Sequence, residues 1–152
     1  MENAAIPPTY DYRKVLTAGQ TNAMATLGFA EHFRVQATVR ALWVSDCVSG
    51  GGQCLAEGLD ISTKVAHCEF RKPYFALETL LCRMHIEDLQ RVSARLIFEY
   101  YDEGGNNLHA IGWQQVVFKD AARKTCRMPL EFAIAARAIL WETRPRDIAN
   151  AN

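Results

Sequence analysis

The chain has 152 residues, of which 49% are hydrophobic, and this composition suits one globular domain with a core of its own. Lysine plus arginine balance aspartate plus glutamate at 17 each, so the sequence has neither a basic field for nucleic acid nor an acidic tail. These numbers argue against disorder and against nucleic-acid binding. They favour a single domain over residues 1–152.

Nothing in the sequence predicts a membrane segment or a secretory leader. The longest apolar runs, such as Ile134–Leu140, are far shorter than the roughly 20 residues that cross a bilayer. Residues Met1–Thr9 lack the basic start and apolar stretch of a signal peptide. We therefore expect a cytoplasmic protein. The five cysteines, odd in number and without a C-x-x-C pair, predict reduced thiols rather than disulfides or zinc.

The first half of the chain predicts a strand, a polar loop and a long helix. Residues Tyr10–Thr17 contain tyrosines and a valine, which favour a strand, and a loop of small and polar residues follows to about Thr26. Residues Phe29–Cys47 contain no glycine or proline, and their apolar residues recur at helical spacing. The glycine run Ser49–Gly52 is expected to end this helix.

After Gly58 the sequence predicts four strands: Asp60–Arg71, Ala76–Glu87, Arg91–Tyr101 and Leu108–Lys119. The third shows the clearest alternation, with Val92, Ala94, Leu96, Phe98 and Tyr100 expected on one face and Ser93, Arg95 and Glu99 on the other. Asp102–Asn107 predicts a hairpin turn. Pro129 opens a short C-terminal helix through about Trp141, so the ordered core spans about residues 10–141.

The long helix carries polar residues where apolar ones are expected. At about 100° per residue, one stripe of the helix contains Phe29, Phe33, Trp43, Val44 and Cys47, and Gln36 and Arg40 fall in its middle. Burying an unpaired guanidinium costs several kcal/mol, so Arg40 must meet a partner, a wet cleft or a substrate. A structural ion pair or a side chain that extends to solvent is the alternative interpretation.

This order of elements predicts an α+β domain in which one antiparallel sheet wraps around a long helix, the arrangement of the hotdog fold. The stretch Gln20–Phe29, followed by Phe33, Gln36 and Arg40, resembles hotdog thioesterases of the hydroxybenzoyl-CoA thioesterase type. It is more similar to the thioesterases of enediyne polyketide synthases, which place Thr-Asn where other members have an aspartate. The similarity runs from Tyr12 to about Ala136 and includes Cys68-Glu69-Phe70, Gln90 and Phe98-Glu99-Tyr100.

The resemblance implies hydrolysis of a polyketide thioester on an acyl carrier protein, with a β-keto acid as product that can lose carbon dioxide to give a polyene. It implies Asn22 and Arg40 as catalytic residues and points to a homodimer or homotetramer. The exposed edge strands of a single sheet also favour pairing with a second copy, with the sites at the interface. We expect no metal or cofactor. The substrate-binding residues it implies are Thr21, Gly28, Phe29, Phe33, Gln36, Glu69 and Phe70. Ala25 stands where the family has glycine and Gly28 where it has tyrosine.

The side chains themselves limit the chemistry. Asn22 is a neutral amide that can orient water or the thioester but is not a strong base. Arg40 can hold the charge that develops on the thioester oxygen, and backbone N–H groups around Gly28 and Phe29 add the positive end of the helix dipole. If a carboxylate is required, Glu31 and Glu69 are the candidates. Glu69 could instead pair with an arginine such as Arg40.

The sequence leaves three other functions open. The first is a general acyl-CoA or acyl-carrier thioesterase. The second is a hotdog dehydratase, for which the required histidine and carboxylate pair is not evident. The third is a non-catalytic acyl-binding module. The four histidines, His32, His67, His85 and His109, show no metal-ligand spacing and are interpreted as structural, surface or pocket-lining residues.

Overall fold

The computed structural model describes residues 8–141; the rest of the predicted domain lies outside the described residues. In chain order the elements are β1 (Tyr10–Val15), the 3₁₀ helix η1 (Ala18–Gln20), α1 (Phe29–Cys47), α2 (Gly51–Ala56), β2 (Asp60–Phe70), β3 (Thr79–Glu87), β4 (Ser93–Tyr101), β5 (Leu108–Lys119) and α3 (Leu130–Ala138). None of the described helices has the length and hydropathy needed to span a bilayer.

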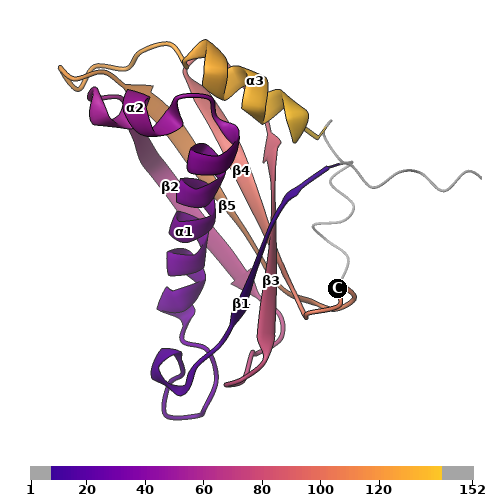
Figure 1. Ribbon diagram of the computed structural model, residues 1–152. Coiled ribbons are helices and arrows are strands. Elements are labelled where there is room, and N and C mark those ends of the chain that lie inside the picture. The colour runs from indigo at the N-terminus through magenta and orange to yellow at the C-terminus, as the bar shows by residue number, and fades with distance from the viewer. Residues whose placement is uncertain (1–7, 142–152) are drawn as a thin grey trace, which may run out of the picture.

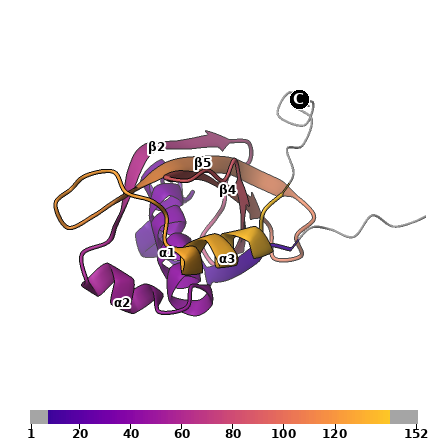
Figure 2. The same ribbon diagram turned by 90° about the horizontal axis from the view of Figure 1, so that it is seen from above.

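The five strands form one antiparallel sheet in the order β1-β3-β4-β5-β2. The sheet curves around α1, which runs along its concave face, and α3 lies across one end (Figures 1 and 2). The predicted α+β arrangement of one sheet wrapped around a long helix is confirmed. The predicted bounds of α1 and β5 match the structure, whereas β3 begins at Thr79 rather than Ala76 because the chain first turns at Leu77, whose φ is +71°.

The residues of α1 that are buried against the sheet differ in part from the predicted apolar stripe. Its buried residues are His32, Val35, Gln36, Val39, Trp43 and Val44. The prediction is correct for Trp43 and Val44 but wrong for Phe29, which is 72% exposed, and for Cys47, which is also exposed. The sheet contacts the side of the helix that includes Val35 and Val39, so the stripe is rotated toward these residues.

An aromatic cluster closes the end of the core beneath α3. The ring of Phe132 in α3 meets Trp43 of α1 edge-on, with 4.9 Å between centroids, and meets Phe118 of β5 at 4.6 Å. Such edge-to-face pairs add to the free energy gained from burial. The predicted C-terminal helix is thus confirmed, with Pro129 as its N-cap and Ala138 as its last residue.

The glycine run does end α1, but a second helix, α2, begins inside it, which was not predicted. A Cβ atom on Gly51 would lie 2.6 Å from the carbonyl oxygen of Val44, too close for any other residue. Glycine therefore lets the first turn of α2 pack directly against the last turn of α1. The low helix propensity of glycine is outweighed here by this close packing.

The outer face of β4 also departs from prediction. Ala94, Leu96, Phe98 and Tyr100 are buried against α1 as expected, but Ser93 and Glu99 on the outer face are buried too. Glu99 accepts a hydrogen bond from the Tyr101 hydroxyl and lies 3.8 Å from Nδ1 of His85. His85 in turn stacks on Trp141, with ring centroids 3.7 Å apart, and Trp141 Nε1 donates to the carbonyl of Pro8 at 3.0 Å. The C-terminal end of the described chain therefore covers part of this face and contacts the N-terminal end.

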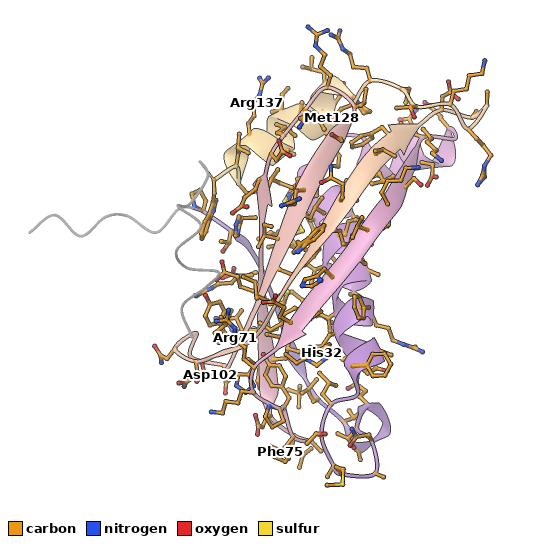
Figure 3. All side chains as sticks on the ribbon, turned by 180° about the vertical axis from the view of Figure 1, so that it is seen from behind. His32, Arg71, Phe75, Asp102, Met128 and Arg137 are labelled. Atoms are coloured by element: carbon orange, nitrogen blue, oxygen red, sulfur yellow. The ribbon has the colours of Figure 1, made fainter. Side chains whose placement is uncertain are left out.

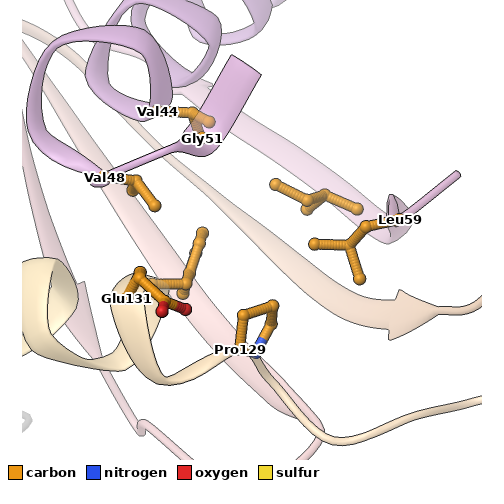
Figure 4. Close-up of a pocket in the computed structure, with 8 residues that line it drawn as sticks. Val44, Val48, Gly51, Leu59, Pro129 and Glu131 are labelled. Carbon is orange, nitrogen blue, oxygen red and sulfur yellow. The ribbon is translucent and has the colours of Figure 1, made fainter. Parts of the chain in front are cut away.

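A small pocket lies between the C-terminal end of α1, α2 and α3, and Val44, Val48, Leu59 and Pro129 line it (Figure 4). Its volume is about 10 Å³, which is room for about one water molecule. It is a packing gap rather than a ligand site, and it lies at the end of α1 opposite the Asn22 loop.

Candidate functional site

The side chain of Asn22 organises the loop that precedes α1. Its Oδ1 accepts hydrogen bonds from the backbone N–H of Met24 at 2.9 Å, from the N–H of Thr26 at 3.3 Å and from the Thr26 hydroxyl at 3.1 Å. The Asn22 N–H donates to the Thr26 carbonyl at 2.8 Å, which closes the loop. The amide oxygen is thus occupied within the loop, and Nδ2 is the side-chain group that remains to act on a ligand.

Ala25, at the tip of this loop, has a φ of +61°. This left-handed conformation favours glycine, because a Cβ atom raises its energy by about 1–2 kcal/mol. This backbone conformation accounts for the glycine that the family resemblance implies at this position. The three hydrogen bonds to Asn22 Oδ1 hold the strained turn in place.

The loop and the start of α1 share one end of the molecule with the chain after β2. The Leu27 N–H donates to the Tyr74 carbonyl at 2.9 Å, and Thr26 and Phe75 form an isolated β-bridge. The side-chain view shows Phe75 and His32 toward this end (Figure 3). Large apolar side chains are exposed in these segments: Met24, Phe29, Phe70, Phe75 and Leu77. Phe29 and Phe70 were predicted to bind substrate, and both lie here.

His32, at the end of the first turn of α1, was not singled out from the sequence. It is 4% exposed, and its ring packs edge-on against Phe70 at 4.7 Å and beside Tyr100 at 5.3 Å. Burial lowers its pKa, so the imidazole is neutral near pH 7. Nδ1 lies 3.3 Å from the Gly28 carbonyl, which can only accept, so the proton sits on Nδ1 and Nε2 is an acceptor.

Gln36 lies one turn further along α1 and is fully buried. Its Nε2 donates to the His67 carbonyl of β2 at 3.2 Å, and its Oε1 accepts from Gln114 Nε2 of β5 at 3.1 Å. The predicted contact of Gln36 with substrate is not visible here, since both ends of its amide bind protein groups. Gln114 was missed by sequence reasoning because it reads as one of several polar residues in β5.

Arg40 completes the row, since His32, Gln36 and Arg40 are spaced four residues apart on the sheet-facing side of α1. Its Nη1 donates to the Thr63 hydroxyl at 2.7 Å and to Gln114 Oε1 at 2.9 Å. Burial lowers its pKa, and the charge of Asp60 opposes that effect. The ion pairs found among residues 8–141 do not include Arg40, so its described partners are neutral.

The two candidate carboxylates lie away from Arg40. The side chain of Glu69 lies on the outer face of β2, away from α1. Its carboxylate is 3.5 Å from Nε2 of His67, so the suggested pairing with Arg40 does not form within one chain. Glu31 lies 3.5 Å from Arg34 on the polar side of α1.

The remaining predicted residues lie near the loop. The Thr21 hydroxyl donates to the Ala18 carbonyl at 2.7 Å, and Phe33 is half-buried. Gly28 is the N-cap of α1, and a Cβ atom there would meet nothing within 4 Å.

Within one chain the predicted residues form two groups. Asn22, Gly28 and Phe29 lie at the start of α1, whereas Arg40 is about three turns, or about 16 Å, further along the helix axis. One chain therefore does not bring Asn22 and Arg40 to the same small group of atoms. Among the described residues, no cluster of His, Cys, Asp or Glu is able to hold a metal ion. Burial raises the pKa of Cys68 to about 12, so its thiol is not an activated nucleophile.

The sequence matches none of the protein-family models, and no curated protein matches it. Solved structures do match. The dynemicin thioesterase superimposes with a TM-score of 0.83 and 23% identity, covering 90% of this chain and 100% of that one. A 1,4-dihydroxy-2-naphthoyl-CoA thioesterase from Synechocystis gives 0.76 and 15%, covering 86% and 96%.

A hypothetical protein from Staphylococcus aureus, solved in complex with CoA, gives a TM-score of 0.82 and 12% identity, covering 99% of this chain and 98% of that one. Likenesses at these identities establish the architecture alone. They agree with the sheet order and with the position of α1 on the concave face. The chain has the hotdog fold.

Proposed function

We propose that this protein is a thioesterase that hydrolyses a β-ketoacyl thioester from an acyl carrier protein in enediyne-type polyketide biosynthesis. The observation that carries the proposal is Arg40, a half-buried guanidinium whose described hydrogen-bond partners are the neutral groups of Thr63 and Gln114. Such a cation is available for an anionic or developing negative charge. The likeness to thioesterases of the same fold supports the reaction class.

In the proposed reaction, water adds to the thioester carbon and the carbonyl oxygen becomes an oxyanion. Arg40 donates to this oxygen from the nitrogens that Thr63 and Gln114 leave free. The carbon–sulfur bond then breaks, and the departing thiolate takes up the proton that the attacking water loses, which gives the carrier thiol. The Asn22 Nδ2 group orients the water or the thioester. The substrate's own keto group withdraws electrons from the thioester, which reduces the need for a protein carboxylate.

The proposed active site combines two copies of the chain. Asn22 lies in the loop before α1, Arg40 is about 16 Å along the axis from the start of α1, and β2 is a long edge strand of the sheet. Edge strands present unpaired backbone groups that favour pairing with another strand. Antiparallel pairing of β2 with β2 of a second copy, centred near Val65, would bring Thr63 and Arg40 of one chain toward the Phe70 end of the other. The homodimer is therefore part of the proposal, and a cytoplasmic setting is its expected context.

The experiment measures thiol release from a β-ketoacyl thioester of N-acetylcysteamine and from the same acyl group on a carrier protein. We expect Arg40→Ala to lower kcat by about 100-fold, the effect of removing one oxyanion donor. Arg34→Ala is the matched control, since Arg34 lies exposed on the same helix and should leave kcat within about twofold. Turnover by Arg40→Ala close to wild type would contradict the proposal.

The non-catalytic acyl-binding module is the second candidate. It is favoured by one observation, that Asn22 uses its amide oxygen within the loop rather than toward a ligand. The same assay separates the two functions. No thiol release from β-keto, short or long acyl thioesters, together with saturable binding of a fluorescent acyl chain, would establish binding. Faster hydrolysis of acyl-CoA than of the carrier-bound acyl group would instead indicate a general acyl-CoA thioesterase.

A further inference from the structure

A chain of hydrogen bonds runs from a backbone carbonyl of β2 to the guanidinium of Arg40. Gln36 Nε2 donates to the His67 carbonyl at 3.2 Å, Gln114 Nε2 donates to Gln36 Oε1 at 3.1 Å, and Arg40 Nη1 donates to Gln114 Oε1 at 2.9 Å. Gln36 is fully buried and Gln114 is nearly so. This series of hydrogen bonds links β2 to α1, then α1 to β5, and finally β5 back to α1.

The His67 carbonyl, where the series begins, fixes which group donates and which accepts in every hydrogen bond that follows. A backbone carbonyl only accepts, so Gln36 must turn its NH₂ group toward His67 and its oxygen toward Gln114. Gln114 must then offer its NH₂ group to Gln36, which leaves its oxygen for Arg40. Beside this series of bonds, the Tyr100 hydroxyl donates to the His32 carbonyl at 2.6 Å. Neither amide is free to flip.

The sheet makes room for this arrangement at Gly112. A Cβ atom there would lie 2.7 Å from the His67 carbonyl oxygen and still closer to Gln36 Nε2. Residue 112 pairs with Cys68 in β2, next to the carbonyl at which the chain of bonds begins. A glycine at this point of β5 allows the amide of Gln36 to lie directly on the sheet.

We propose that Gln114 is a positioning residue, which Gln36 orients so that its oxygen holds the Arg40 guanidinium toward the thioester without neutralising its charge. This inference rests on the proposed thioesterase function. An acceptor is required at this point, and a carboxylate would form an ion pair with Arg40 and compete with the oxyanion. The amide supplies the acceptor without the charge. Gln114 touches Arg40 and acts through it.

The kinetic test compares Gln114→Glu, Gln114→Met and the matched control Gln115→Glu, which adds the same charge to the neighbouring residue on the outer face of β5. We expect Gln114→Glu and Gln114→Met to lower kcat at pH 8 by about 10-fold or more, with KM within about threefold. Gln115→Glu should stay within twofold of wild type. Because an ion pair with Arg40 lowers the pKa of the introduced carboxyl and keeps it ionised, the deficit of Gln114→Glu relative to wild type should persist as the pH falls toward 5.

A second measurement follows Arg40 directly by NMR of its guanidinium nitrogens, assigned by their absence in Arg40→Ala. We expect slow rotation about the Nε–Cζ bond in the wild type and fast rotation in Gln114→Met. Equal rotation in the two proteins would overturn the inference, whatever the activity. Normal kcat in both Gln114 variants, with Arg40→Ala inactive, would also overturn it while leaving the proposed function intact. If the wild type hydrolyses no thioester, the proposed function fails and the rotation measurement alone decides.

Discussion

Ala25 shows how one backbone angle in the Asn22 loop constrains a residue. Its φ of +61° is held by the hydrogen bonds that Asn22 Oδ1 accepts from Met24 and Thr26. The loop therefore contains local strain that its hydrogen bonds offset. The same three bonds explain why Asn22 is exposed and yet has a fixed orientation.

Replacing Ala25 with glycine should stabilise the protein. We expect Ala25→Gly to raise the free energy of unfolding by about 0.5–1 kcal/mol, because the left-handed conformation carries no Cβ penalty for glycine. Ala37→Gly is the control with the opposite sign, since residue 37 is exposed within α1 and glycine there should lower stability by about 1 kcal/mol. Urea unfolding measures both. A loss of stability in Ala25→Gly would contradict the assigned backbone.

His32 should make stability depend on pH. Burial lowers its pKa in the folded protein, so the unfolded chain binds more protons as the pH falls below about 6.5. The contribution of neutral His32 is thus complete above about pH 6.5 and is lost as the pH drops toward the folded pKa. We expect the loss of unfolding free energy between pH 8 and pH 5 to be smaller in His32→Gln than in the wild type.

The control for this measurement keeps the histidine. Ala37→Gly should lower stability by the same amount at each pH, because it changes helix propensity and not a titrating group. An identical pH dependence in His32→Gln and the wild type would show that the imidazole is not desolvated in the folded state.

Among the elements, the contact between α1 and β5 depends on glycine. A Cβ atom on Gly112 would clash with the backbone of His67 and with Gln36. We expect Gly112→Ala to lower the free energy of unfolding by about 2 kcal/mol, in the range of overpacked cores. Gly19→Ala is the control, because a Cβ atom on Gly19 meets nothing within 4 Å. Thermal unfolding compares the two, and equal stability of Gly112→Ala and wild type would contradict this close approach.

The periodic elements were predictable, and the irregular ones were not. Phe29–Cys47 and Leu108–Lys119 match their predicted bounds because continuous helical or strand patterns mark both. Helix α2 was missed because its packing on Val44 is a tertiary contact that outweighs glycine propensity. The register shift near Thr63 in β2 also has no signature in an alternation pattern.

The part of the candidate site that lies on a periodic element was predictable, and the part that depends on tertiary contacts was not. Arg40 was identified because a charge interrupts an apolar stripe, and the structure places it half-buried against β2 and β5. His32 continues the same four-residue spacing, and that signal was available in the sequence. Gln114 was not predictable, because its partners come from another element and are brought together only by the fold.

At the scale of the whole molecule, the separation of Asn22 and Arg40 predicts that two copies share each site. Coexpression of Asn22→Ala and Arg40→Ala chains produces hybrid dimers in which one of the two sites has both native residues. Since half of the random dimers are hybrids, we expect about a quarter of wild-type turnover from the mixture. Each variant alone should be nearly inactive. A mixture as inactive as its components would show that both residues act within one chain.

The hydrogen bond between Trp141 and Pro8 brings the two ends of the described chain within one side-chain length of each other. A short peptide linker could therefore join residue 141 to residue 8. New chain ends could then be made at the exposed turn that contains Gly104. The polypeptide is thus suited to circular permutation. A permuted chain that joins residue 141 to residue 8 and starts in the β4–β5 turn would keep all five strands and the whole of α1 uninterrupted.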